Sequence, residues 1–318
     1  MPRESIDTSI ESQRRHAHIA WWLAHHVLLS PGVAAGCAAA VILLLGSGCD
    51  TTPAEKRAIA HRPEPVNPLV CRLASYGRFQ DIAWTHLPSI GVRYVFMNVP
   101  PPDQVEVVKQ RLAKHGLAAM VLRGETDLSK PDSIGELAVQ LGTCQKLGVR
   151  YMFLSPKRRG ATKETVYQRL REAGDVAHRY GVTITLETHP DLGTNGDVHV
   201  ETMKRINHPN IRVNFDTGNI TYYNKGANAV VELRKCMDYV GTVELKDHSG
   251  GLEEWSFPTL GQGAVDLAGV VRMLKQHGYA GPITLEIEGV KGIDMTEAET
   301  RKMIEDSVAY VRSLGQFR

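Results

Sequence analysis

Four acidic residues stand at matching places near the ends of four successive β-branched or apolar segments in the second half of the chain. They are Glu187, Asp216, Glu244 and Glu286. Carboxylates that share one cavity repel each other unless protons or a cation neutralise them. The pattern therefore predicts one bound divalent cation. An all-oxygen ligand set favours Mn²⁺ or Mg²⁺ over the alternatives Co²⁺ and Zn²⁺.

The alternation of side chains along each segment indicates where these acids point. Glu187 shares a face with Thr183 and Thr185, and the opposite face of segment 182–189 is apolar. The other three acids lie on the polar faces of their own segments. Apolar strand faces pack under helices, so we expect the acids to face a common interior. A structural alternative stays open, in which some of the acids form salt bridges with Arg72, Arg212 or Lys246.

The elements that would position these acids recur regularly from Pro68 onward. Short apolar segments alternate with segments at helical spacing, such as 103–115, 133–147, 163–180 and 296–314. Strands separated by helices pair in parallel, and eight repeats without a dinucleotide-binding glycine motif favour a closed barrel. We predict an α/β fold, a single-domain (βα)8 TIM barrel. Its expected strands are 69–76, 92–99, 117–123, 149–155, 182–189, 211–217, 240–247 and 282–288.

Composition limits the classes of partner. The chain has 318 residues, of which 42% are hydrophobic, so a large core is available. The formal net charge of +2 gives no strong field toward nucleic acid, and we expect no such partner. The five cysteines show neither metal-knuckle spacing nor a disulfide framework.

The first 66 residues differ from the rest of the chain. An uncharged apolar run at 33–45 is followed by small residues and Cys49, which resembles a bacterial lipoprotein signal, although Gly46 stands where leucine is usual. We expect lipidation of Cys49 or membrane attachment through this segment, with export to the bacterial periplasm or cell envelope. If translation starts later, the protein is cytoplasmic. The predicted division is a signal peptide or membrane anchor at 1–49, a linker at 50–66 and the barrel at 67–318.

Several short motifs together resemble the sugar phosphate isomerase/epimerase family. This is the xylose isomerase-like TIM-barrel group that includes ketose 3-epimerases and inosose dehydratases. The resemblance covers roughly residues 68–316 and depends on the order and spacing of the motifs. They lie at 186–190, 214–219, 245–247, 260–263 and 285–289.

The resemblance implies a ligand set for the divalent cation. In the family, a Glu, an Asp, a His and a Glu from strands five to eight bind one metal ion. Glu187, Asp216 and Glu286 match three of these positions, whereas Glu244 stands where the family has histidine. Either Glu244 or His248 would complete the shell, or the metal site is weakened.

The resemblance also implies an activity. The family members move a proton next to a carbonyl of a sugar through an enediolate, so Glu187 and Glu286 would be the catalytic pair. Two alternatives stay open, namely a metal-dependent lyase or dehydratase on a keto-sugar or keto-inositol, and a non-catalytic carbohydrate-binding lipoprotein. In all three cases the partner is a small sugar or polyol, and homo-oligomerisation is left open.

Five further residues are candidates for contact with that sugar. Some lie one inward step beyond a predicted ligand, and one is an aromatic residue in the loop after strand seven that could stack on a sugar face. The candidates are His189, Asn219, Lys246, His248 and Trp255.

Overall fold

The computed structural model describes residues 65–318. The predicted signal or anchor at 1–49, with Cys49, and nearly all of the linker lie outside these residues. Within the described part, no helix combines the length and the apolar character that crossing a membrane requires.

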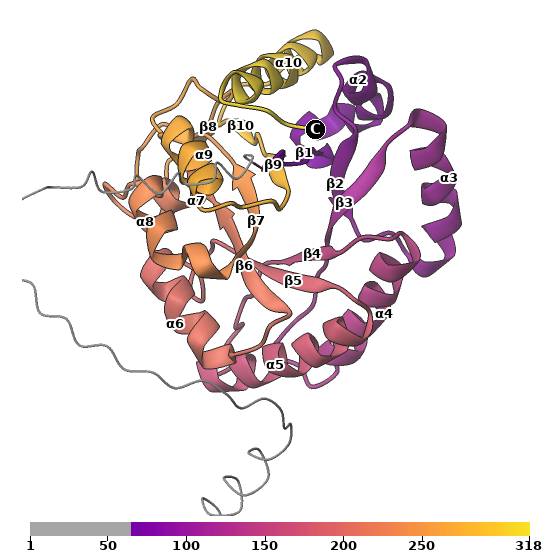
Figure 1. Cartoon of the computed structure of the whole chain (residues 1–318), viewed down its shortest axis with the longest axis vertical. Coiled ribbons are helices and arrows are strands. Elements are labelled where there is room, and N and C mark those ends of the chain that lie inside the picture. The colour runs from indigo at the N-terminus through magenta and orange to yellow at the C-terminus, as the bar shows by residue number, and fades with distance from the viewer. Residues whose placement is uncertain (1–64) are drawn as a thin grey trace, which may run out of the picture. The chain divides into compact units, whose positions relative to one another are not determined.

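Eight parallel strands close into a barrel, which confirms the predicted fold (Figure 1). The strands neighbour one another in the order β1, β2, β3, β4, β5, β6, β7 and β9. Each strand is parallel to both neighbours, so all eight carboxyl-terminal ends lie on one side of the barrel. Their bounds are Leu69–Arg72, Tyr94–Asn98, Ala118–Arg123, Tyr151–Leu154, Thr183–Glu187, Ile211–Asp216, Val240–Leu245 and Ile283–Leu285.

Helices surround the barrel, and the longer ones bury an apolar stripe against the strands (Figure 1). In α5 (Lys163–Arg179) the buried residues include Val166, Leu170 and Ala177, spaced at helical intervals. Three 3-10 segments complete the set: η1 (Leu73–Ile82), which is interrupted at Gly77 and Phe79, η2 (Pro102–Gln104) and η3 (Met237–Tyr239). The helices are α2 (Ala83–Ser89), α3 (Val105–His115), α4 (Ser133–Lys146), α5 (Lys163–Arg179), α6 (Gly196–Ile206), α7 (Thr217–Tyr223), α8 (Ala229–Cys236), α9 (Leu267–Gln276) and α10 (Glu297–Ser313).

The alternation of side chains separates an outer core from the barrel interior. Ile184 and Leu186 belong to the large core between strands and helices, as the sequence predicts. A second, separate cluster consists of Val70, Phe96, Val121 and Phe153. These four come from β1 to β4 and lie two residues before Arg72, Asn98, Arg123 and Ser155 in the sequence.

Several strands are shorter than predicted because the chain turns at their carboxyl-terminal ends. β1 stops at Arg72, where η1 begins, β7 stops at Leu245 and β9 stops at Leu285. The predicted ends of β1, β7 and β9 were therefore four, two and three residues too late, respectively. After β7 and β9 the chain forms a small antiparallel sheet of β8 (Ser256–Phe257) and β10 (Gly289–Val290).

Candidate metal and sugar site

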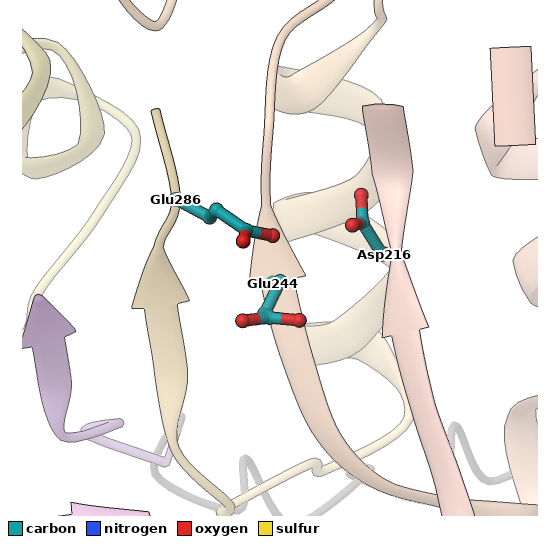
Figure 2. A group of neighbouring side chains, drawn as sticks. All are labelled: Asp216, Glu244 and Glu286. Atoms are coloured by element: carbon teal, nitrogen blue, oxygen red, sulfur yellow. The ribbon is translucent and has the colours of Figure 1, made fainter. Parts of the chain in front are cut away.

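Three of the four predicted carboxylates converge at the carboxyl-terminal end of the barrel. Asp216 ends β6, Glu244 lies in β7 and Glu286 directly follows β9. One oxygen from each lies within 4.8 Å of the other two, and all three residues are buried. Figure 2 shows the three side chains pointing toward one another from adjacent strands. The register that pairs Asp216 with Glu244 places the acids at one level.

The hydrogen bonds of these acids leave oxygens available for a cation. Oδ1 of Asp216 accepts the backbone N–H groups of Gly218 and Asn219 at 2.9 and 3.0 Å, which caps α7. Oε2 of Glu244 accepts from the amide of Asn214 at 2.7 Å. In contrast, Oδ2 of Asp216 and Oε2 of Glu286 are buried without any hydrogen-bond donor. Buried oxygens of this kind, in an all-oxygen set, suit a hard divalent cation.

Two cationic side chains border the carboxylates, so part of the structural alternative is also present. Arg72 Nη1 pairs with Glu286 and lies 3.2 Å from Oε1 of Glu244. Lys246 Nζ lies 3.5 Å from both Asp216 Oδ2 and Glu286 Oε2, and it also pairs with Glu288. The third suggested partner, Arg212, makes no ion pair within residues 65–318. The ion pairs reduce the repulsion between the acids, but Lys246 makes no hydrogen bond to Asp216 Oδ2 or Glu286 Oε2, so both oxygens stay without a hydrogen-bond donor.

Burial changes the protonation of the acids. Desolvation raises the pKa of Glu244 to about 7, although nearby Arg72 opposes this shift. Desolvation likewise raises the pKa of Asp216 to about 6, against the effect of Lys246. Without a divalent cation, the cluster therefore holds protons close to neutral pH.

Glu187, the fourth predicted ligand, is placed differently from the other three. It ends β5, is half-buried and lines a cavity of about 210 Å³ at the mouth of the barrel. It is not part of the group within 4.8 Å. Its carboxylate makes no hydrogen bond or ion pair with any residue of the described part, so it is available to a bound molecule.

Four of the five predicted sugar contacts line this same cavity. They are His189, Asn219, Lys246 and Trp255. Asn219 is held by two contacts, since its amide donates to the carbonyl of Thr188 at 2.9 Å and its Oδ1 accepts from Lys246 at 3.2 Å. Its orientation is therefore fixed before any ligand binds.

His248 does not have the position that the sequence suggested for an alternative ligand. Its Nδ1 bonds with the hydroxyl of Thr221 at 2.9 Å, and its Nε2 bonds with the carbonyl of Glu254, also at 2.9 Å. The two ring nitrogens thus bond to α7 and to the loop after β7, and the ring does not line the cavity. Its geometry fits an anchor for the loop after β7, and Glu244 stands in the carboxylate group instead.

Aromatic side chains form a wall of the cavity, and of its tyrosine, tryptophan and phenylalanine residues only Trp255 was predicted from the sequence. Trp255 packs edge-on against Phe257 with ring centroids 5.2 Å apart, and Tyr223 packs against His189 at 5.1 Å. Desolvation, followed by the charge of Glu187, raises the pKa of Tyr223, so its phenol stays protonated. Tyr222 and Tyr223 both line the cavity, and their position in the helix directly after Asp216 was the available signal.

The glycine-rich loop after β7 is tied to Asp247. The carboxylate of Asp247 accepts backbone N–H groups of Gly261, Gly263 and Val265 at 2.8, 2.9 and 3.2 Å. A Cβ added at Gly263 would lie 2.2 Å from Oδ1 of Asp247. The absence of a side chain at Gly263 thus permits a close approach to Asp247, which the sequence alone did not indicate.

Comparison with known proteins identifies the class. Residues 84–314 match the family described as xylose isomerase-like TIM barrel, so the chain belongs to that family. A ketose 3-epimerase of Arthrobacter globiformis is 25% identical over 64% of this chain and 81% of its own length. An inosose isomerase of Bacillus velezensis is 27% identical over 57% of this chain and 68% of its own length. An uncharacterised protein of Methanocaldococcus jannaschii is 26% identical, but only 43% of it is covered.

Solved structures share the fold. The D-psicose 3-epimerase of Clostridium cellulolyticum H10, solved with D-tagatose, superposes with a TM-score of 0.65 at 15% identity, covering 78% of this chain and 99% of that one. The IOLI protein, solved with a zinc atom, gives a TM-score of 0.63 at 19% identity and covers 77% and 98% of the two chains.

Proposed function

We propose that this protein is a sugar isomerase or epimerase that uses one divalent cation to move a proton on the carbon next to a carbonyl. The observation that carries this proposal is the convergence of Asp216, Glu244 and Glu286, with two buried oxygens that lack donors. The ketose 3-epimerase and inosose isomerase relatives support the reaction class.

The cation would be held by Asp216, Glu244 and Glu286, with Glu187 as a fourth ligand from the cavity wall. When bound, it supplies Lewis-acid polarisation of the substrate oxygens, which makes the neighbouring C–H group more acidic. Oxygen ligands favour Mn²⁺ or Mg²⁺. A zinc-containing relative shows that the fold admits other divalent metals.

Glu187 and Glu286 are the proposed proton-transfer pair. Glu187 makes no bond to the rest of the described chain and borders the cavity, so its carboxylate can reach a substrate carbon. Glu286 is oriented by Arg72 through one oxygen and lies near Lys246 through the other. A general base must lie within hydrogen-bond reach of the proton that it removes, and both acids border the same space.

Deuterium incorporation tests the proposal. The full chain, loaded with Mn²⁺, would be incubated in D₂O with a panel of ketoses and keto-inositols, and the metal would be removed with a chelator before NMR analysis. We expect exchange at a carbon next to the carbonyl, together with an isomer or epimer. Glu187→Gln should reduce the rate by about a hundredfold or more, which is the usual scale of general acid–base catalysis.

Glu201→Gln is a matched control, because Glu201 is exposed on α6 and should leave exchange unchanged. An elimination product in place of an epimer would instead indicate a lyase. If the metal-loaded protein exchanges no proton of any panel member and Glu187→Gln leaves sugar binding unchanged, the non-catalytic alternative replaces the proposal.

A further inference from the structure

The acids at the mouth of the barrel come from its second half, whereas the cations Arg72, Arg123 and Lys157 come from its first half. Acids end the second half of the barrel, as described above. In the first half, Arg123 ends β3 and Ser155 directly follows β4. Each lies two residues beyond an interior residue, Val121 and Phe153 respectively, so alternation turns both toward the interior.

Arg123 and Ser155 line the same cavity as Glu187, and each has a polar atom without a hydrogen-bond partner. Nε of Arg123 and Oγ of Ser155 are both buried without a hydrogen-bond partner. Within residues 65–318, the Arg123 guanidinium makes no ion pair. Lys157, also unpaired in this part of the chain, is exposed at the edge of the cavity.

Unlike Arg123, two other cations in the cavity have carboxylate partners. Arg72 pairs with Glu244 and Glu286, and Lys246 pairs with three carboxylates. A buried guanidinium nitrogen without an acceptor is costly, and most such groups in native proteins have a partner. The missing acceptor at Arg123 therefore points to a bound molecule, and a guanidinium fork fits the oxygens of a carboxylate or phosphate.

We propose that the natural substrate is an acidic sugar, with a carboxylate or phosphate group held by Arg123 and Ser155 and with Lys157 at the rim. Its carbonyl and hydroxyl groups would lie toward Glu187, at the end of the neighbouring strand β5, and toward Glu286 on the far side of the barrel. The inference rests on the proposed function for the placement of the reacting end. The placement of the anionic group rests only on the unpaired groups of Arg123 and Ser155, at the ends of β3 and β4.

Calorimetric titration with matched pairs of sugars tests the inference. The probes are D-glucuronate against D-glucose, and D-fructose 6-phosphate against D-fructose, with the full chain loaded with Mn²⁺. At least one acidic sugar should bind tenfold or more tightly than its neutral partner. Whichever pair shows the larger ratio identifies carboxylate or phosphate as the natural group.

Arg123→Gln should abolish this preference while leaving the dissociation constant of the neutral sugar unchanged, and Ser155→Ala should reduce it. Arg150→Gln is the matched control, because Arg150 precedes β4 at the opposite end of the barrel. Equal binding of acidic and neutral sugars, absence of binding by both acidic sugars, or a preference that survives Arg123→Gln would overturn the inference. If deuterium exchange is intact in that case, the proposed function still stands.

Discussion

At the scale of single residues, the site consists of three mutually repelling carboxylates whose charge the neighbouring cations neutralise only in part. Asp216, Glu244 and Glu286 are buried together, and Arg72 and Lys246 offset only part of their charge. Protons can neutralise the remaining negative charge near neutral pH, as the raised pKa values of Glu244 and Asp216 indicate. A divalent cation would displace those protons, so metal binding and pH should be linked.

Metal affinity should fall as the pH falls. Glu244 must be ionised to bind a cation, and its pKa of about 7 means that it is mostly ionised at pH 8 and mostly protonated at pH 6. We expect the apparent affinity for Mn²⁺ to drop by about tenfold or more across this range. Titration calorimetry at both pH values measures the change. Glu244→Gln should show a smaller dependence, and an unchanged slope in this variant would contradict the assignment.

Strand alternation predicted the inward acids and Lys246 from the sequence, but not all of the other neighbours. Arg72 was considered only as one of three salt-bridge partners, because its contact with Glu286 joins β1 to β9 across the closure of the barrel. Arg123 and Ser155 could have been found by the same alternation. The hydrogen bonds of His248 could not have been found in this way, because they depend on how the loop after β7 folds back.

At the scale of elements, the loop after β7 is the least predictable part of the site. Its two-residue strand β8 is too short to produce a sequence pattern, and it forms only by pairing with β10, more than thirty residues later. The loop is organised by Asp247, which lies in one of the motifs recognised in the sequence. The contacts of Asp247 are with backbone groups, which a sequence pattern does not reveal.

Removal of the Asp247 carboxylate should loosen this loop. Asp247→Ala leaves several backbone N–H groups near Gly261 and Gly263 without an acceptor, which should lower the free energy of unfolding by about 2–4 kcal/mol. Urea unfolding measures this loss, and sugar KM should rise because Trp255 lies in the same loop.

Asp294→Ala provides the control, because Asp294 is exposed and pairs with the exposed Arg78. A surface pair of this kind contributes little to stability. If Asp247→Ala were no more destabilising than Asp294→Ala, the loop would not depend on these hydrogen bonds.

At the scale of the whole molecule, the barrel was the most predictable feature. Eight alternating segments indicate parallel pairing, and their number, without a dinucleotide-binding glycine motif, favours the closed barrel that the structure shows. The less predictable feature is the division of the interior, in which β1 to β4 supply an apolar floor of Val70, Phe96, Val121 and Phe153. Export and lipidation at Cys49 stay predictions, because that segment lies outside the described residues.

The central claim is that the buried acids of the barrel bind one divalent cation. Calorimetric titration of the chelator-treated full chain with Mn²⁺ at pH 8 tests it most directly, with Asp216→Asn as the variant and Asp306→Asn as the control, since Asp306 forms an exposed surface pair with Lys302. We predict one site per chain in the wild type and in the control, and an affinity lower by about 100-fold or more in Asp216→Asn. No binding by the wild-type chain, or undiminished binding by Asp216→Asn, would contradict the account.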